Sequence, residues 1–173
     1  MYFLQSYQSP LGEIYLAGND EYLTGLWFKG KKYDNNALMS EYRVETVRVL
    51  EETKSWLDIY FQGKKPDFMP QVEINASSFT ASVLEHLREI PYGKTVTYGY
   101  IADILARERG IGYMSAQAVG NAVGRNPISI IIPCHRVIGS NGNLTGYAGG
   151  LERKAALLRL EGIDTEKCKQ LNL

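Results

Sequence analysis

The stretch that says most about the fold of this protein is NPISIIIPCHRV, residues 126–137. The apolar run Ile128–Ile132 is typical of a buried extended segment, and it leads directly into Pro133 and Cys134. Asn126 and Pro127 end the helix that precedes this run. We therefore expect a strand to carry the thiol of Cys134 to a place partly shielded from water.

Two basic side chains, His135 and Arg136, follow Cys134, and positive charge beside a thiol favours the nucleophilic thiolate. Adjacent side chains in an extended segment cannot easily bond directly, so we expect a water between Cys134 and His135. A third group must then orient the imidazole, and Glu161 is the candidate because it sits in a last helical turn, where the helix dipole disfavours a carboxylate. The alternatives are a small buried core cysteine and an ordinary surface glutamate.

Upstream of this centre the chain reads as mostly helical. Ser78 is the expected cap of a helix that reaches Ile90. Thr97 and Ser115 are the expected caps of two shorter helices, 97–105 and 115–124. This pair predicts a helix-turn-helix, although the connector 106–114 is longer than the usual tight turn.

The second helix of that pair has two different faces. Val119, Ala122 and Val123 suit a protein core, whereas the opposite face carries little bulk: Gln117, Gly120, Asn121 and Gly124. Because glycine inside a helix costs about 1 kcal/mol relative to alanine, two glycines on one face need a reason. Close approach to another molecule's backbone is one reason, and close packing against a neighbouring helix of the same protein is the other.

The first part of the chain predicts a small sheet. Residues 1–8, 12–18 and 22–28 are rich in aromatic and β-branched residues and are separated by turn signals. Val44, Val47, Leu50, Leu57 and Phe61 then recur at helical spacing, and Gly63 ends that helix. We predict an α+β protein, with an N-terminal β-sheet domain at 1–76 and a C-terminal helical domain at 77–173.

Charge is divided unevenly between these two parts. Residues 1–76 carry a net charge of −3 and residues 77–173 a net charge of +3, although the whole chain is neutral. The difference suggests an anionic partner for the second part, and a solvated face is the alternative. We see no basic leader and no run of about 20 apolar residues, which predicts a cytoplasmic protein without a membrane partner.

The cysteines indicate a reducing compartment and free thiols, since the chain holds only Cys134 and Cys168, and a disulfide between them is the alternative. A structural zinc site is a weaker interpretation because Cys134 and His135 lack ligand spacing and the chain has only one other residue of each type. We therefore expect no metal and no cofactor, and we expect Cys168 to be a bystander.

Three motifs carry a resemblance to a known family. They are PCHRV at 133–137 with NP just upstream, GYAGGL at 146–151, and YGKTVTY at 92–98. Together they resemble the O6-alkylguanine-DNA alkyltransferase family over most of residues 78–163. In that family the N-terminal region is a small β-sheet domain with ribonuclease-H-like topology, which residues 1–76 match in length and layout.

The resemblance implies a role for each matching residue. Cys134 is implied as the alkyl acceptor, His135 as a base acting through water, and Glu161 as the acid that orients it. Asn126 is implied as a hinge beside the cysteine turn, and Tyr98 as the group that helps rotate the nucleotide and protonates guanine. The implied contacts to DNA or to the flipped base come from Gln117, Gly120, Arg136, Val137, Tyr147 and Ala148.

One position departs from the family pattern. Many members have an arginine that intercalates where the flipped base was, and here that place holds Gln117, which brings no charge. A branch of the family lacks the cysteine and only binds lesions, so Cys134 places this chain in the reactive branch.

The implied activity is a single, irreversible transfer from O6-alkylguanine, with O4-alkylthymine as a possible second substrate, in double-stranded DNA. The protein would act as a monomer and bind the minor groove with little sequence preference. The rival interpretations are a cysteine hydrolase that uses Cys134 and His135, and a DNA-binding module without enzymatic activity.

Overall fold

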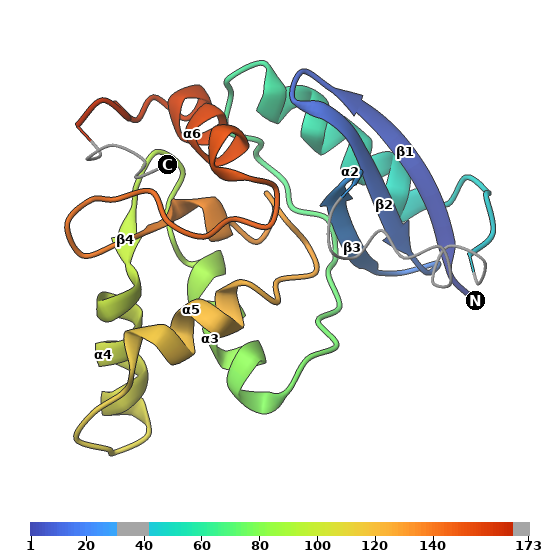
Figure 1. Ribbon diagram of the computed structural model, residues 1–173. Coiled ribbons are helices and arrows are strands. Elements are labelled where there is room, and N and C mark those ends of the chain that lie inside the picture. Colours follow the sequence, from blue (N-terminus) through green and yellow to red (C-terminus); the bar gives the residue numbers. More distant parts are fainter. Residues whose placement is uncertain (31–41, 168–173) are drawn as a thin grey trace. The chain divides into compact units, whose positions relative to one another are not determined.

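The computed structural model describes residues 1–30 and 42–167 (Figure 1). The chain divides into two compact units. The first comprises Met1–Asn75 together with Pro127–Ser129, and the second comprises Ala76–Asn126 together with Ile130–Leu173. Strands dominate the first unit and helices the second, so the predicted α+β class is confirmed. Cys168 lies outside the described residues.

A three-stranded antiparallel sheet forms the centre of the first unit. Its strands β1 (Phe3–Ser9), β2 (Gly12–Gly18) and β3 (Leu23–Phe28) pair in the order β1-β2-β3, which confirms the three predicted strands. A two-residue turn joins β1 to β2, since Ser9 pairs with Gly12. The turn before β3 is closed by Asn19, whose side-chain oxygen accepts from two backbone amides.

One helix, α2 (Arg48–Phe61), covers this sheet and contacts all three strands. It buries one apolar face against the buried side chains of the sheet; the buried residues of the helix include Val49, Leu50, Trp56, Leu57 and Tyr60. The predicted start of the helix was too early. Val44 lies outside it with 84% of its surface exposed. Val47 is the capping residue and the helix ends before Gly63, whose φ of +75° suits glycine.

Residues 127–129 belong to the sheet unit although they are distant from it in sequence. The backbone amide of Leu26 in β3 donates to the carbonyl of Pro127 (2.9 Å), and Leu26 accepts from the amide of Ser129 (2.8 Å). These two bonds make a parallel bridge between Leu26 and Ile128. The chain thus joins the first unit for three residues before it continues toward Cys134.

The remainder of the apolar run is a turn, and the predicted extended segment at Ile128–Ile132 was therefore wrong beyond Ile128. Ile130 has a φ of +70°, a backbone conformation that is uncommon for a β-branched residue. All of these residues are buried, as predicted. An apolar run predicts burial, but it does not distinguish a strand from a buried turn.

The described part of the second unit contains four α-helices: α3 (Ser78–Arg88), α4 (Tyr98–Glu108), α5 (Ala116–Val123) and α6 (Leu151–Leu160). Helices α4 and α5 pack against each other, and α3 packs against both. The hydroxyls of Thr97 and Ser115 accept from the first-turn amides of α4 and α5, which confirms both caps. The cap of α3 is Ser77 and not the predicted Ser78.

A short parallel ladder links two distant segments of the second unit. Strand β4 (Val96–Thr97) pairs with β5 (Val137–Ile138), which directly follows the 3₁₀ turn η1 (Cys134–Arg136). Val96, and with it the start of α4, is therefore held beside the backbone that leaves Cys134.

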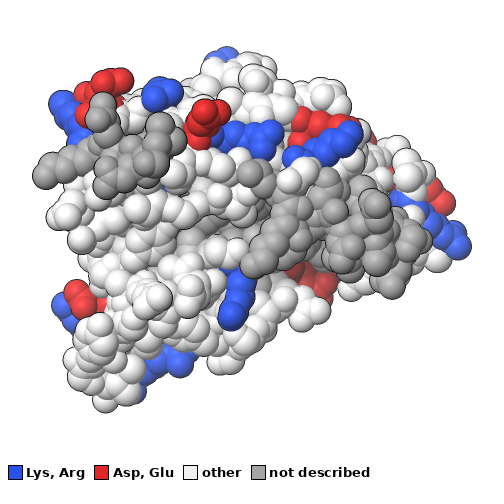
Figure 2. Space-filling model, viewed as in Figure 1, with Lys and Arg blue, Asp and Glu red and all other residues white. Residues whose placement is uncertain are grey.

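Positive and negative side chains are interspersed on the face drawn in Figure 2, and most of that face is uncharged. No continuous basic surface is visible there. Among the described residues, no helix is both long and apolar enough to cross a bilayer.

Candidate active site

Cys134 opens the 3₁₀ turn η1 and is only 5% exposed, with a free thiol. Its backbone amide donates to the carbonyl of Ile132 (2.8 Å). The same carbonyl accepts from the side-chain amide of Asn126, also at 2.8 Å. Asn126 is buried three residues beyond the end of α5, so its amide group ties that helix to the turn that carries the cysteine.

The electrostatic environment of Cys134 differs from the expectation. Burial raises the pKa of the thiol, while a hydrogen bond from Asn126 and the positive charge of Lys154 act in the opposite direction. The charges of His135 and Arg136, from which a thiolate was expected, are directed to Glu161 and do not face the thiol. The thiol must lose its proton to another group before it can act as a nucleophile.

His135 and Glu161 form a fully buried pair. The imidazole Nε2 lies 2.6 Å from Oε1 of Glu161, and both side chains have no exposed surface. Burial lowers the pKa of His135, although the carboxylate opposes this shift. Burial would raise the pKa of Glu161, but the hydrogen bond and charge of His135, together with Arg136, bring it down to about 2. The pair is therefore a neutral imidazole and a carboxylate, and Nδ1 is left as the nitrogen that accepts a proton.

Two further groups hold the carboxylate of Glu161. Arg136 donates from Nε to Oε2 (2.8 Å) and from an Nη to Oε1 (3.0 Å), and the amide of Gly93 donates to Oε2 (3.1 Å). Glu161 is the capping residue at the end of α6. These four donors compensate for the unfavourable helix dipole, and the surface interpretation of Glu161 is wrong.

Arg136 itself is placed differently from the expected DNA contact. It is 8% exposed, and its other Nη donates to the carbonyl of Ile90 (2.7 Å). The guanidinium also lies 5.7 Å from the ring centre of Tyr92. With its donors directed inward, Arg136 orients Glu161 and does not present its charge to a partner.

Tyr98 is the first residue of α4, and its hydroxyl donates to the carbonyl of Thr145 (3.0 Å). Burial raises the pKa of this phenol, so Tyr98 keeps its proton at neutral pH. Carbon atoms added to Gly120 or Gly146 would lie 3.7 Å from Tyr98. Tyr98 therefore lies between helix α5 and the glycine-rich loop 139–150.

The residues expected to bind a base are spread over β5 and that loop. Tyr147 and Ala148 are half-buried in the loop. Val137 has no exposed surface, and its carbonyl accepts from the ammonium of Lys154 (2.6 Å). Val137 therefore packs beneath this region and presents neither side chain nor backbone to a base.

Helix α5 has the two faces that were predicted. Val119, Ala122 and Val123 are buried, whereas Gln117, Asn121 and Gly124 are exposed. A carbon added at Gly120 would make only ordinary contact with Tyr98, at 3.7 to 3.8 Å. Packing within the protein therefore does not demand glycine at position 120, which favours close approach of another molecule as the reason for it.

Sequence reasoning missed Lys154, which is completely buried on α6. A signal for its burial was present, because Leu151, Lys154, Ala155 and Leu158 recur at the spacing of one helical face. Lysine at such a position is ordinarily interpreted as a boundary residue whose ammonium reaches water.

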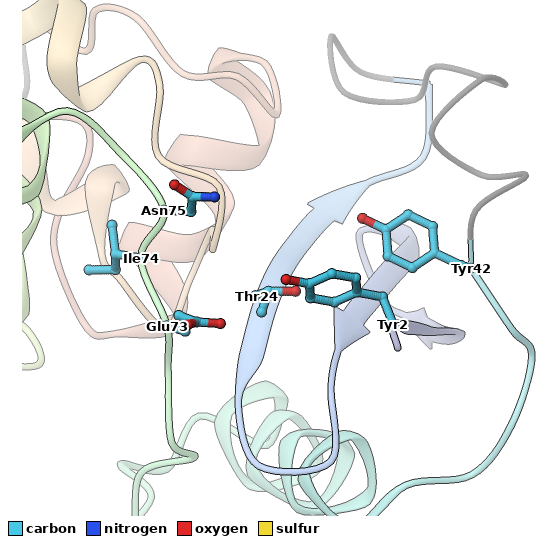
Figure 3. Close-up of a pocket in the computed structure, with 6 residues that line it drawn as sticks. All are labelled: Tyr2, Thr24, Tyr42, Glu73, Ile74 and Asn75. Carbon is cyan, nitrogen blue, oxygen red and sulfur yellow. The ribbon is translucent and has the colours of Figure 1, made fainter.

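A pocket of about 560 Å³ lies in the first unit, and no predicted site residue lines it (Figure 3). Its lining residues are Tyr2, Thr24, Tyr42, Glu73, Ile74 and Asn75. Within residues 1–30 and 42–167, no group of three potential metal-ligating side chains occurs.

Comparison with known proteins gives a consistent result over nearly the whole chain. Residues 78–163 match the family model of the 6-O-methylguanine DNA methyltransferase DNA-binding domain, and residues 3–74 match that of its ribonuclease-like domain. A methylated-DNA–protein-cysteine methyltransferase from Methanosarcina acetivorans is 44% identical over 157 residues, which cover 90% of this chain and 96% of the relative.

Solved structures agree with the sequence comparison. The O6-methylguanine methyltransferase of Mycobacterium tuberculosis is similar with a TM-score of 0.80 and 37% identity, covering 93% of each chain. A structure described as the OGT of that organism in complex with DNA has a TM-score of 0.78 and 38% identity, covering 92% of this chain and 91% of that one. The chain therefore belongs to the methylated-DNA–protein-cysteine methyltransferase family.

Proposed function

We propose that this protein repairs DNA by moving the alkyl group of O6-alkylguanine onto the sulfur of Cys134. The observation that carries the proposal is a buried free thiol followed in sequence by a histidine whose partner is an ionised, buried glutamate. That arrangement supplies a nucleophile and a base on adjacent residues of one buried turn. The family to which the chain belongs supports the same substrate.

Activation of the thiol begins at Glu161. Its carboxylate holds the Nε2 hydrogen of His135, which leaves Nδ1 to accept a proton. A water between Nδ1 and Cys134 would pass the thiol proton to the imidazole, and the resulting imidazolium would be stabilised by Glu161. The neutral resting state of His135 suits it to this role, because an imidazole that is already protonated cannot act as a base.

The transfer step then forms one bond and breaks another. The thiolate of Cys134 attacks the alkyl carbon, a C–S bond forms, and the bond between that carbon and O6 breaks. Its electron pair stays on guanine, which takes a proton from the hydroxyl of Tyr98. The thioether is stable, so each molecule acts once.

The remaining site residues would prepare the substrate. The low-bulk face of α5, with Gln117 and Gly120, would enter the minor groove, and the target nucleotide would rotate out of the duplex at a cost of a few kcal/mol. The half-buried loop residues Tyr147 and Ala148 would receive the extruded base, with Val137 packed beneath them. Asn126 would brace the cysteine turn against α5.

Several broader expectations belong to the same proposal. The first unit acts as a scaffold, the protein works as a monomer, and the division of the chain at residues 76 and 77 approximates its functional domains. A cytoplasmic location would keep the thiol of Cys134 reduced. O4-alkylthymine is a possible second substrate.

The test is to incubate the protein with duplex DNA that contains O6-methylguanine and to weigh the intact protein. We expect a gain of one methylene for each chain, located at Cys134 by peptide mass spectrometry and absent in Cys134→Ala. The Cys134→Ala variant should still bind the duplex. No mass gain with retained DNA affinity would favour a binding module, and turnover of esters or amides would favour a cysteine hydrolase.

A further inference from the structure

The connector between α4 and α5, the yellow loop in Figure 1 that extends past the end of α4, carries an exposed aromatic side chain. Tyr113 is 78% exposed, and Ile111 is 46% exposed two residues before it. In the described part of the second unit, the other large apolar or aromatic side chain with comparable exposure is Tyr100, in the first turn of α4. A carbon added at Gly112 would meet no described atom within 4 Å, so the surroundings of Tyr113 are open.

Both ends of this connector are fixed. At the end of α4 the amide of Ile111 donates to the carbonyl of Ala106 (2.9 Å), and the φ of Gly110 is +64°. These are features of a Schellman motif, which closes a helix. Two residues after Tyr113, the hydroxyl of Ser115 accepts from the amides that open α5. A side chain on so short a segment loses little conformational freedom when a partner binds it.

The connector and the ends of its two helices carry net positive charge. Residues 107–125 contain three basic residues, Arg107, Arg109 and Arg125, and one acidic residue, Glu108. The carboxylate of Glu108 lies 3.0 Å from Nε2 of His86 on α3, so it is engaged within the protein. Residues 110–124 include no charged side chain. A polyanion can therefore approach the connector without repulsion from this segment.

The proposed place of α5 brings the connector to the DNA. An α-helix with its side chains is about 10–12 Å wide, whereas the minor groove is about 6 Å wide. Because a helix of that width cannot sink into the groove, the chain that enters the helix meets the sugar–phosphate strand beside it. Tyr113 stands two residues before the cap of α5 and Gln117 two residues after it. When Gln117 enters the groove, the connector should therefore reach this strand.

We propose that the connector, residues 109–115, is a second DNA-binding element in which Tyr113 lies against the sugar–phosphate strand at the edge of the minor groove. Its ring covers deoxyribose carbon atoms, and its hydroxyl donates to a phosphate oxygen. Such contacts carry no sequence information, so they add affinity for any duplex and position α5 on it. The contact rests on the proposed function, in which α5 binds duplex DNA.

The length of the connector has a purpose in this scheme. A usual helix-turn-helix has a turn of about three or four residues. Here α4 ends at Glu108 and α5 begins at Ala116, and the added residues extend the DNA-binding surface beyond α5. A hydrogen bond from Tyr113 to a charged phosphate is stronger than one between neutral groups. It therefore replaces part of the affinity that the neutral Gln117 does not supply.

Variants of Tyr113 test the proposal through the affinity for duplex DNA. Tyr113→Ala should bind about five- to tenfold more weakly than wild type, and Tyr113→Phe, which keeps the ring, should lie between the two. Fluorescence anisotropy at one fixed salt concentration measures the affinity for an undamaged duplex and for the same duplex with O6-methylguanine. Because the contact is to the DNA backbone, we expect the same loss with both duplexes.

Tyr2→Ala is the matched control, since it removes a tyrosine that is 47% exposed in the first unit and should leave the affinity unchanged. The melting temperatures of these variants should stay close to that of wild type, because both side chains are exposed. An unchanged affinity in Tyr113→Ala would overturn the inference. A loss confined to the duplex with O6-methylguanine would also overturn it, since that result indicates contact with the lesion.

A set of modified duplexes locates the contact on the DNA. In each duplex one phosphate is replaced by a methylphosphonate, which has no charge. We expect one position at which this change weakens binding of wild type but not of Tyr113→Phe, because the hydroxyl and that phosphate form one bond. If the two proteins lose equal affinity at every position, the hydroxyl does not bind phosphate and the proposal is wrong.

Two different measurements separate the connector contact from the proposed alkyl transfer. Transfer is read from the mass of the intact protein, whereas the connector is tested by affinity alone. A wild-type protein that binds duplex but gains no mass contradicts the proposed function and leaves the test of Tyr113 in force. A normal mass gain with unchanged affinity in Tyr113→Ala contradicts the connector contact alone, and a wild-type protein that binds no duplex contradicts both.

Discussion

Replacing Glu161 with glutamine removes one negative charge and leaves the shape of the side chain nearly unchanged. The carboxylate accepts bonds from His135, twice from Arg136, and from the amide of Gly93, at 2.6 to 3.1 Å. The amide oxygen of glutamine can accept some of these bonds. Its NH₂ group, however, would face other hydrogen-bond donors and could not bond to them. The guanidinium of Arg136 then remains buried without an opposing charge.

The size of the effect follows from the pKa of Glu161. Its folded value is about 2, against an ordinary 4.5. That difference corresponds to about 3 kcal/mol of stability at neutral pH. A loss of this size agrees with the roughly 3–5 kcal/mol lost when one partner of a buried ion pair is removed. For a chain of this length the melting temperature should fall by about 10 °C.

The loss of stability in Glu161→Gln should become smaller as the pH falls. Because the folded pKa of Glu161 is depressed, its contribution is complete above pH 4.5 and is lost as the pH falls toward 2. Urea unfolding of wild type and Glu161→Gln should therefore differ by about 3 kcal/mol at pH 7 and by about 1–1.5 kcal/mol at pH 3. Single-turnover transfer should also slow about a hundredfold, since His135 loses its orienting partner.

Glu152→Gln is the control for Glu161→Gln, because it makes the same change on an exposed residue of α6 and should alter stability by less than about 0.5 kcal/mol. A difference between wild type and Glu161→Gln that stays constant from pH 7 to pH 3 would refute the ionised, hydrogen-bonded state of this carboxylate. A rate equal to wild type would refute its role in orienting His135.

Two substitutions test helix α5. Gly120→Ala should raise the free energy of unfolding by about 0.5–1 kcal/mol through helix propensity, since the added carbon finds ordinary contact at 3.7 Å, yet weaken binding to duplex DNA. Urea unfolding measures the stability change, and fluorescence anisotropy measures the affinity for duplex DNA. An unchanged affinity would show that DNA does not approach α5 closely at Gly120. Gln117→Arg should strengthen duplex binding and steepen its salt dependence by about one unit of logarithmic slope. Anisotropy titrations across salt concentrations measure this, and a slope equal to wild type would show that position 117 does not approach phosphate.

Local chemistry made much of the fold predictable. Turn residues such as Asn19 separate the strands, and the hydroxyls of Thr97 and Ser115 cap helices where their sequence positions suggest. At the start of α3 two adjacent serines both suit a cap, and the backbone conformation of Ser77 decides between them. Such one-residue differences depend on tertiary packing, which local signals do not contain.

The electrostatics of the site could not be predicted from adjacency. His135 and Arg136 follow Cys134 in the sequence, but both direct their polar atoms to Glu161, which lies 26 and 25 positions farther along the chain, respectively. These two side chains therefore interact with the carboxylate of Glu161 and do not stabilise a thiolate at Cys134. The cation that does so, Lys154, comes from α6, and its effect depends on complete burial.

The parallel bridge between Leu26 and Ile128 has a consequence for how the chain acquires its native state. It joins residues roughly a hundred positions apart, a non-local contact of the kind that slows folding. During synthesis the residues of strand β3 are made long before Ile128. The edge of β3 can therefore form first and then bind the segment that leads to Cys134. A fragment that began at residue 76 would contain Cys134 but not strand β3, to which residues 127–129 bind. Even if its helices form, the segment before Cys134 should therefore fold incorrectly in this fragment.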